Sequence, residues 1–114
     1  MEGNRLELHS MLNDVMEQCG EEPHLYFQPP ESVKLVYPCF LYKLQTYNTR
    51  FADNDPYKIR VSYAVTYITR SPTSIVPQTL LKKHGISFDR YYVADNLHHY
   101  VYTYTSHVKE NPNG

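Results

Sequence analysis

The chain has 114 residues, of which 41% are hydrophobic and 20% charged, and its net charge is −1. This balance predicts a single globular domain spanning residues 1–114, with a core large enough to fold without disulfide bridges. Because the chain is almost neutral and has no Lys/Arg cluster, we expect no sequence-independent nucleic-acid binding by one subunit, although a ring of copies could build a charged lumen. No apolar run is long enough to span a membrane, and the first residues lack the apolar core of a signal peptide.

Tyrosine is unusually frequent, with 12 Tyr and no Trp. Tyrosine is favoured in strands and at interfaces, because it buries a large ring and still offers a hydroxyl group. The two cysteines, Cys19 and Cys39, are too few for a disulfide framework and too far apart for a C-x-x-C site. We expect two reduced thiols in a soluble protein that is made inside a cell.

The first predicted element is a helix over residues 5–19, where apolar residues recur at the i, i+3, i+4 and i+7 spacing. Gly20 follows at the position of a left-handed C-cap, and Pro23 ends the element. The apolar stripe predicts core packing and consists of Leu8, Met11, Leu12, Val15, Met16 and Cys19.

Two strands are predicted next, a short one at Leu25–Gln28 and a longer one at Cys39–Tyr47. Pro29 and Pro30 stop the first strand because they remove two amide donors. In the second strand, alternating residues are expected to face opposite sides of the sheet: Phe40, Tyr42 and Leu44 on one side, and Cys39, Leu41 and Lys43 on the other.

The clearest strand follows Pro56, because a period of two continues over about ten residues, as in an antiparallel strand with one buried face. Large side chains occupy one face of this strand: Tyr57, Ile59, Val61, Tyr63, Val65 and Tyr67. The stretch between this strand and the preceding one is too long for a tight hairpin. It predicts an extended β-hairpin arm, or a protruding loop, at about residues 46–57.

Residues 74–85 predict a short second helix, with Ser74 as its cap, Leu80 and Leu81 packed inward, and Gly85 at its end. Two more strands are expected, at Ile86–Val93 and His99–Thr105. In the latter, the tyrosines at 100, 102 and 104 share one face. The polar tail 106–114 is expected to fray.

The predicted element order is α-β-β-β-α-β-β. This order favours an α+β fold with a mixed or antiparallel sheet of four to five strands and both helices on one face. The uncovered face is expected to carry tyrosines and threonines, and a tyrosine-rich sheet face favours a binding partner.

The tripeptide Ala-Asp-Asn occurs twice, at 52–54 and at 94–96. Asp and Asn favour turns because their side chains bond to nearby backbone, whereas a Ca²⁺ or Mg²⁺ site needs several converging oxygen ligands. Both copies are therefore interpreted as turns or contact-making loop tips. No metal is expected, and His98 and His99 cannot easily share an ion because neighbours on a strand point to opposite faces.

Catalytic motifs are also lacking. Cys39 follows a proline at a strand start without a Gly-rich oxyanion turn, there is no G-x-S-x-G motif, and 4 Gly leave no phosphate-cradling loop. The sequence predicts neither an enzyme nor a cofactor.

Three longer motifs resemble a family of proteins. They are "YFQPPESVKLVYP" at 26–38, "RFADNDPY" at 50–57 and "FDRYYVADNLHHYV" at 88–101. The chain resembles, over about residues 6–105, the small tail terminator or tail-completion proteins of tailed phages and prophages of Gram-positive bacteria. The one departure is His98, where the family pattern has Asn, and this change leaves a turn intact.

The resemblance implies an α+β subunit of the virion head–tail junction, assembled in the host cytoplasm as a hexameric ring. The ring would cap the tail tube, stop tube polymerisation and dock to the head connector or stopper protein above. Genome DNA would pass through its lumen without specific binding, and no membrane is involved. The alternative is a head-completion or connector-docking protein, a stopper or adaptor, of the same junction.

Residues were assigned to candidate interfaces by their type. Tyrosines on the predicted strands are candidate anchors, although about half are expected to be core residues. Charged residues could form ion pairs between subunits or fix loops, and a buried ion pair within one subunit is the alternative for Asp89 and Arg90. The candidates are Arg50, Asp53, Asn54, Tyr57, Tyr63, Tyr67, Asp89, Arg90, Asp95, Asn96, Tyr100, Tyr102 and Tyr104.

Overall fold

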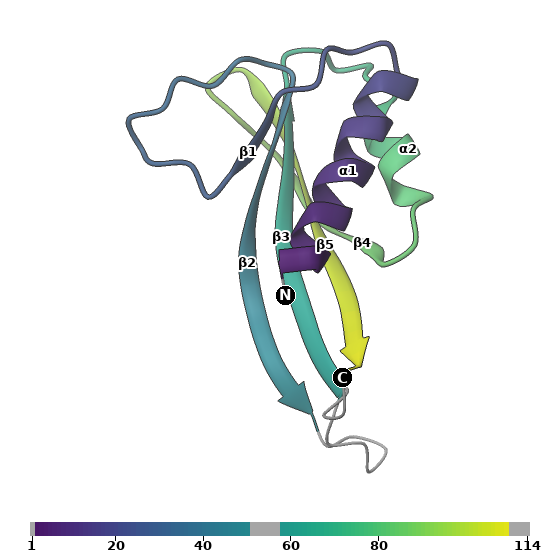
Figure 1. The fold of residues 1–114 in the computed structure, drawn as a ribbon. Coiled ribbons are helices and arrows are strands. Elements are labelled where there is room, and N and C mark those ends of the chain that lie inside the picture. Colours follow the sequence, from purple (N-terminus) through teal and green to yellow (C-terminus); the bar gives the residue numbers. More distant parts are fainter. Residues whose placement is uncertain (1, 51–57, 110–114) are drawn as a thin grey trace.

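The structure, a computed structural model, describes residues 2–50 and 58–109. It is an α+β protein with a five-stranded mixed sheet and two helices, which confirms the predicted class at this level (Figure 1). The elements are α1 (Glu2–Gln18), β1 (Leu25–Phe27), β2 (Cys39–Arg50), β3 (Lys58–Thr69), α2 (Val76–Leu81), β4 (Ile86–Ala94) and β5 (Leu97–Lys109).

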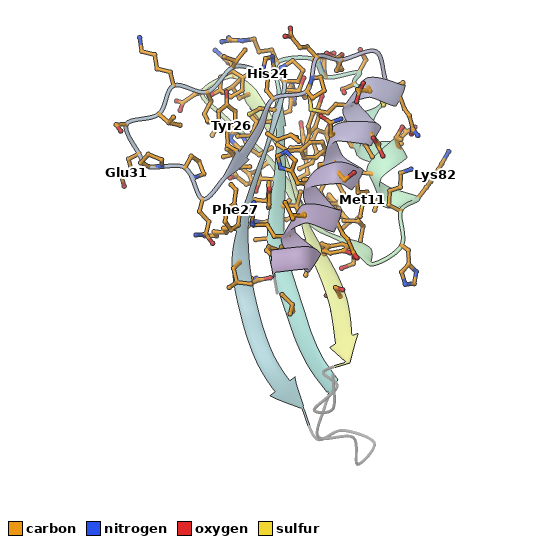
Figure 2. The ribbon with its side chains drawn as sticks, in the orientation of Figure 1. Met11, His24, Tyr26, Phe27, Glu31 and Lys82 are labelled. Atoms are coloured by element: carbon orange, nitrogen blue, oxygen red, sulfur yellow. The ribbon has the colours of Figure 1, made fainter. Side chains whose placement is uncertain are left out.

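The strands are arranged in the order β1-β2-β3-β5-β4. β1 pairs with β2 in parallel, and the other three pairs are antiparallel. The connection from β1 to β2 therefore has to return along the strands, and Glu31 lies at its outer bend in Figure 2. β4 and the three-residue β1 are the outer strands of the sheet.

Both helices cover the same face of the sheet (Figure 1). α1 presents the predicted stripe, and its residues Leu8, Leu12, Val15 and Met16 have no exposed surface. α2 contributes two core residues, and the remaining ones come from β2, β3 and β5. Burial of this apolar area is the main stabilising contribution to such a two-layer fold.

α1 differs from the prediction by three residues at its start and by one residue at its end. The helix begins at Glu2 rather than at residue 5. At its other end, Gly20 has φ +77°, the left-handed conformation expected of a C-cap glycine. The N–H of Glu21 donates to the carbonyl of Met16 at 2.9 Å, which satisfies one of the last helical carbonyls.

The second helix is shorter than predicted, because α2 has only one and a half turns from Val76 to Leu81. Its N-cap position is Ile75, not Ser74, although the Ser74 hydroxyl accepts a bond from the N–H of Val76 at 3.3 Å. Leu80 is fully buried, as predicted. Leu81 is 47% exposed, so its predicted inward packing is wrong, since a helix this short buries one narrow stripe.

The long strands extend beyond the helical layer (Figure 1). β2 and β3 stay paired as far as Arg50 and Lys58, and β5 pairs with β3 up to Lys109. The predicted fraying from residue 106 is therefore wrong for 106–109, because these residues gain a ladder with β3. The rest of the tail lies outside the described residues.

A two-residue turn joins β4 to β5. Asp95 and Asn96 have φ values of 54° and 62°, and Ala94 pairs with Leu97 across the turn. Positive φ at both central residues is the geometry of a tight hairpin turn, which Asn and Asp tolerate better than most residues. The turn interpretation of the second Ala-Asp-Asn is confirmed, whereas the first lies outside the described residues.

Candidate interaction surfaces

Most of the tyrosines predicted as interface anchors lie in the core instead. Tyr63, Tyr67, Tyr102 and Tyr104 are at most 8% exposed, and Tyr100 packs partly buried against them. The alternation of side chains along these strands was predicted well, but the helices cover the face that carries these tyrosines, which the prediction had left open. Large rings fill the space between a sheet and two helices, so these residues are unavailable to a partner.

The hydroxyl groups of three core tyrosines form hydrogen bonds with other residues. Tyr42 bonds to His9 Nδ1 at 2.7 Å, and Tyr67 bonds to the Ser74 hydroxyl at 3.0 Å. Tyr102 donates to the backbone carbonyl of Pro77 at 3.2 Å. Burial raises the pKa of each of these three phenols, so they remain neutral at physiological pH.

The face opposite the helices, called the open face, carries small and hydroxyl-bearing side chains. Cross-strand pairs place Ala64 beside Thr103 and Ser62 beside Thr105 on this face. Threonines were expected here and are present. Since short side chains keep the backbone accessible, this face allows another protein surface to approach closely.

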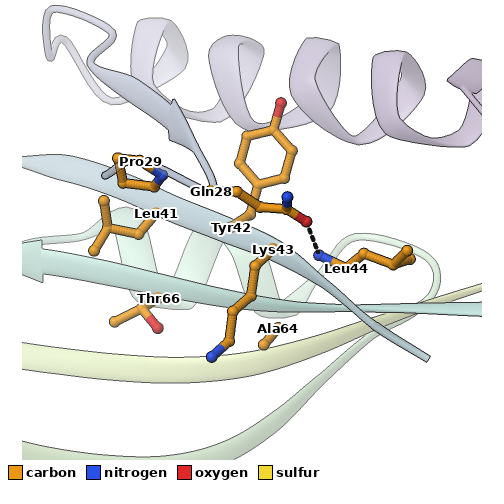
Figure 3. Close-up of a pocket in the computed structure, with 8 residues that line it drawn as sticks. All are labelled: Gln28, Pro29, Leu41, Tyr42, Lys43, Leu44, Ala64 and Thr66. Carbon is orange, nitrogen blue, oxygen red and sulfur yellow. Dashed lines mark hydrogen bonds between the residues drawn. The ribbon is translucent and has the colours of Figure 1, made fainter. Parts of the chain in front are cut away.

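A groove of about 480 Å³ lies on the open face beside the end of β1. Figure 3 shows Leu41, Lys43 and Thr66 projecting to this side of the strands, and Tyr42 projecting to the opposite side towards α1. The amide oxygen of the Gln28 side chain accepts a bond from the N–H of Leu44 at 3.1 Å and so fixes one rim of the groove. The groove is mainly apolar, with one cation.

The outer strand β4 is the most exposed apolar part of the described sheet. Phe88, Tyr91, Tyr92 and Val93 are between 42% and 54% exposed. The pairing of β4 with β5 shifts register between Phe88 and Arg90, so that Asp89 is an extra residue, a β-bulge. An exposed apolar edge strand is a surface to which other strands add.

Aromatic and histidine rings stack in pairs on the two sides of the β4–β5 hairpin. Tyr91 stacks on His98 with a 15° interplanar angle, and its hydroxyl lies 2.7 Å from His98 Nδ1. Tyr92 stacks on His99 with centroids 4.5 Å apart. The two histidines therefore belong to separate stacks, and both lie outside the turn at Asp95 and Asn96.

The remaining candidates lie in β4, in the β4–β5 turn, at the end of β2, or outside the described residues. Asp89 and Arg90 are both exposed, so the alternative of a buried pair is wrong; the Arg90 guanidinium lies 5.9 Å from the Tyr92 ring centroid. Asp95 and Asn96 form the exposed hairpin turn described above. Arg50 is the last residue of β2, and three candidates lie outside the described residues: Asp53, Asn54 and Tyr57.

The sequence-based selection missed the exposed apolar residues of β4 and the residues of the groove. The signal for β4 was present, because Phe88 to Val93 lacks the alternation of a strand with one buried face. Nothing in the sequence identified the groove, since it depends on β1 pairing in parallel beside β2.

Within residues 2–50 and 58–109, no group of three or more His, Cys, Asp or Glu side chains could hold a metal ion. In the same residues, no helix has the length and apolar character needed to cross a membrane. Cys39 is fully buried, and burial raises the pKa of its thiol to about 12, so the reactive thiolate form is suppressed.

Compared with known proteins, the chain matches no family model and has no significant match among curated proteins.

Proposed function

We propose that this protein is a structural subunit of the head–tail junction of a tailed phage. Copies form a closed ring, hexameric in the tail-terminator reading, that caps the tail tube, stops its polymerisation and docks to the head connector. The protein acts through its shape and not through catalysis, and genome DNA passes through the ring without specific contacts. The three sequence motifs that resemble tail terminators support this assignment.

The observation that carries the proposal is that one subunit has two unlike surfaces. The paired ends of β2 and β3 project past the helices as far as Arg50 and Lys58, whereas the body presents an open face with a groove. A ring of identical subunits requires head-to-tail contacts between two different surfaces. In this proposal, the projecting ends of β2 and β3 carry the contact with the next subunit; the rest of the predicted arm, 51–57, lies outside the described residues.

Electron microscopy of particles assembled without this protein tests the function. Overlong or headless tails are the expected result, because nothing would stop the growth of the tube. Tails of normal length beside unjoined heads would instead identify a connector-side protein of the same junction, the alternative function. Normal, infectious particles would contradict both.

A shortened arm tests the ring contact separately. Arg50 and Lys58 are cross-strand partners, so replacing residues 51–57 by Asn-Gly closes the hairpin with a two-residue turn. The variant should keep the far-UV circular dichroism of the wild type and lose ring formation in native mass spectrometry. A ring that persists would show that residues 51–57 are not needed for the contact.

A further inference from the structure

β4 is an outer strand, and among the described strands none lies on its far side. Its pairing with β5 is interrupted by the bulge at Asp89. From Arg90 to Ala94 the pairing is regular, and it ends at the turn that begins with Asp95. The longer regular stretch of the free edge is therefore Arg90–Ala94, bounded by a bulge and a turn, and a three-residue stretch, Ile86–Phe88, precedes the bulge.

This stretch combines exposed apolar side chains with accessible backbone groups. Tyr91, Tyr92 and Val93 are 47%, 42% and 54% exposed. In the described part of the chain, no backbone hydrogen bond outside the β4–β5 ladder involves residues 87–94. Such an edge favours strand addition, because the added strand satisfies the backbone groups and covers the side chains.

We propose that β4 pairs in antiparallel orientation with β4 of a second copy of this chain, about a two-fold axis beside Tyr92. In this register Tyr92 lies opposite its own counterpart. Tyr91 lies opposite Val93 of the second copy, and Arg90 lies opposite Ala94 of the second copy. The two five-stranded sheets become one continuous sheet across the contact.

The register follows from the two faces of the strand. Tyr91 pairs with Tyr100 on the helix side, and Tyr92 stacks on His99 on the open side. Directly opposed residues must share a face, and an axis beside Tyr92 meets this condition for all pairs. An axis beside Tyr91 would extend the pairing into the bulge, and one beside Val93 would extend it into the turn.

The side chains in this register are complementary. Tyr91 meets Val93 of the second copy on the helix side, once on each side of the axis, and aromatic–β-branched pairs are favourable across strands. Arg90 lies opposite Ala94 of the second copy, one residue from Asp95 of that copy. Two pairs of opposite charges are therefore brought together by the same register.

The stretch is short, so the contact lies at the small end of specific interfaces, and the dimer should dissociate on dilution. It is also independent of the proposed ring. A two-fold contact uses the same surface on both copies, whereas a closed ring uses two different surfaces. Pairing covers an edge that would otherwise promote aggregation of unassembled protein.

Cysteine crosslinking tests the register directly. In Tyr92→Cys, the two introduced thiols lie opposite one another, and oxidation by oxidised glutathione should yield a covalent dimer. Tyr91→Cys is the matched control, because residue 91 opposes 93. By strand geometry, its two copies are separated by about 8 Å between Cα atoms, beyond disulfide reach. The double variant Tyr91→Cys, Val93→Cys should crosslink again.

The outcomes are distinct. The register is supported if Tyr92→Cys and the double variant form the crosslinked dimer. It also requires that Tyr91→Cys, and the wild type with its native Cys19 and Cys39, form none. Equal crosslinking of both single variants would indicate random collision and overturn the proposal. No crosslinking of Tyr92→Cys above the wild type would also overturn it.

Sedimentation equilibrium provides a second measurement without new cysteines. Arg90→Glu places a like charge near Asp95 of the second copy and should reduce the dimer fraction, whereas Lys34→Glu, on the exposed connection between β1 and β2, should leave it unchanged. A wild type that is strictly monomeric at every concentration would contradict the proposal. So would equal dimer fractions in the two variants.

Discussion

The phenolic hydroxyl group of Tyr102 in β5 donates a hydrogen bond to the backbone carbonyl of Pro77 in α2. This bond joins the short helix to the sheet at a buried position. Tyr102→Phe removes the donor and with it this buried hydrogen bond, so we expect a loss of about 1 kcal/mol in the free energy of unfolding.

Urea denaturation measures this loss, with Tyr92→Phe as the control. Tyr92 is 42% exposed, so its variant should unfold within about 0.5 kcal/mol of the wild type. If both variants had equal stability, the Tyr102 bond would contribute nothing to the position of α2.

The two left-handed glycines should differ in their tolerance of alanine. Gly20 and Gly85 have φ values of 77° and 84°, so either substitution carries the cost of a left-handed alanine, about 1–2 kcal/mol. At Gly85, a Cβ would also lie 2.9 Å from the carbonyl oxygen of Thr105, whereas at Gly20 it meets nothing within 4 Å. Gly85→Ala should therefore be clearly more destabilising than Gly20→Ala.

Thermal unfolding of the two alanine variants gives this comparison directly. The Thr105 N–H also donates to the Gly85 carbonyl at 2.9 Å, so a displaced backbone would weaken that bond as well. Equal melting temperatures would mean that the chain relaxes around position 85 at no cost.

The turn between β4 and β5 should accept glycine and reject β-branched residues at position 96. Asn96 has φ 62°, which glycine adopts without strain, so Asn96→Gly should preserve or slightly raise stability. Asn96→Val should cost about 1–2 kcal/mol, because a β-branched side chain is strained there. Chemical denaturation of both variants checks the sign as well as the size.

Stability should fall at alkaline pH. Burial raises the pKa of the Cys39 thiol from 9.0 to about 12, so the folded state holds a proton that the unfolded state releases. The thiol's contribution is complete below pH 9 and is lost between about pH 9 and pH 12. Buried phenols such as Tyr67, whose pKa is also raised by burial, act in the same direction.

The free energy of unfolding, measured by denaturation at several pH values, should decline more gradually for Cys39→Ala than for the wild type. The comparison concerns the slope, since the substitution also leaves a cavity. An identical slope for the two proteins would contradict a buried, protonated thiol.

The sequence predicted local structure well where one period dominated. The alternation from Val61 to Tyr67 and the stripe from Leu8 to Met16 each identify a face, because burial on one side requires that spacing. It did not tell which sheet face the helices would cover. Which face they cover depends on the packing of large rings against α1 and α2. An alternating strand sequence separates two faces, but it does not show on which of them the helices pack.

The candidate surfaces were harder to predict because they depend on strand order. Phe88 and Tyr92 are exposed since β4 is the last strand of the sheet, and a central strand of the same sequence would bury them. Tyr63 and Tyr102 were predicted as anchors by residue type, and residue type cannot separate a core tyrosine from an interface tyrosine.

The extra residue at Asp89 determines which side chains β4 displays on each surface. In an uninterrupted strand that continued the alternation of Ile86 and Phe88, position 90 would point towards the helices and position 91 away from them. A guanidinium group would then meet the apolar layer, and the Tyr91 ring would leave its place beside Tyr100. One inserted amino acid thus shifts the inward–outward alternation of the outer strand by one residue. Its deletion would exchange the apolar and the charged side chains between the two faces of that strand.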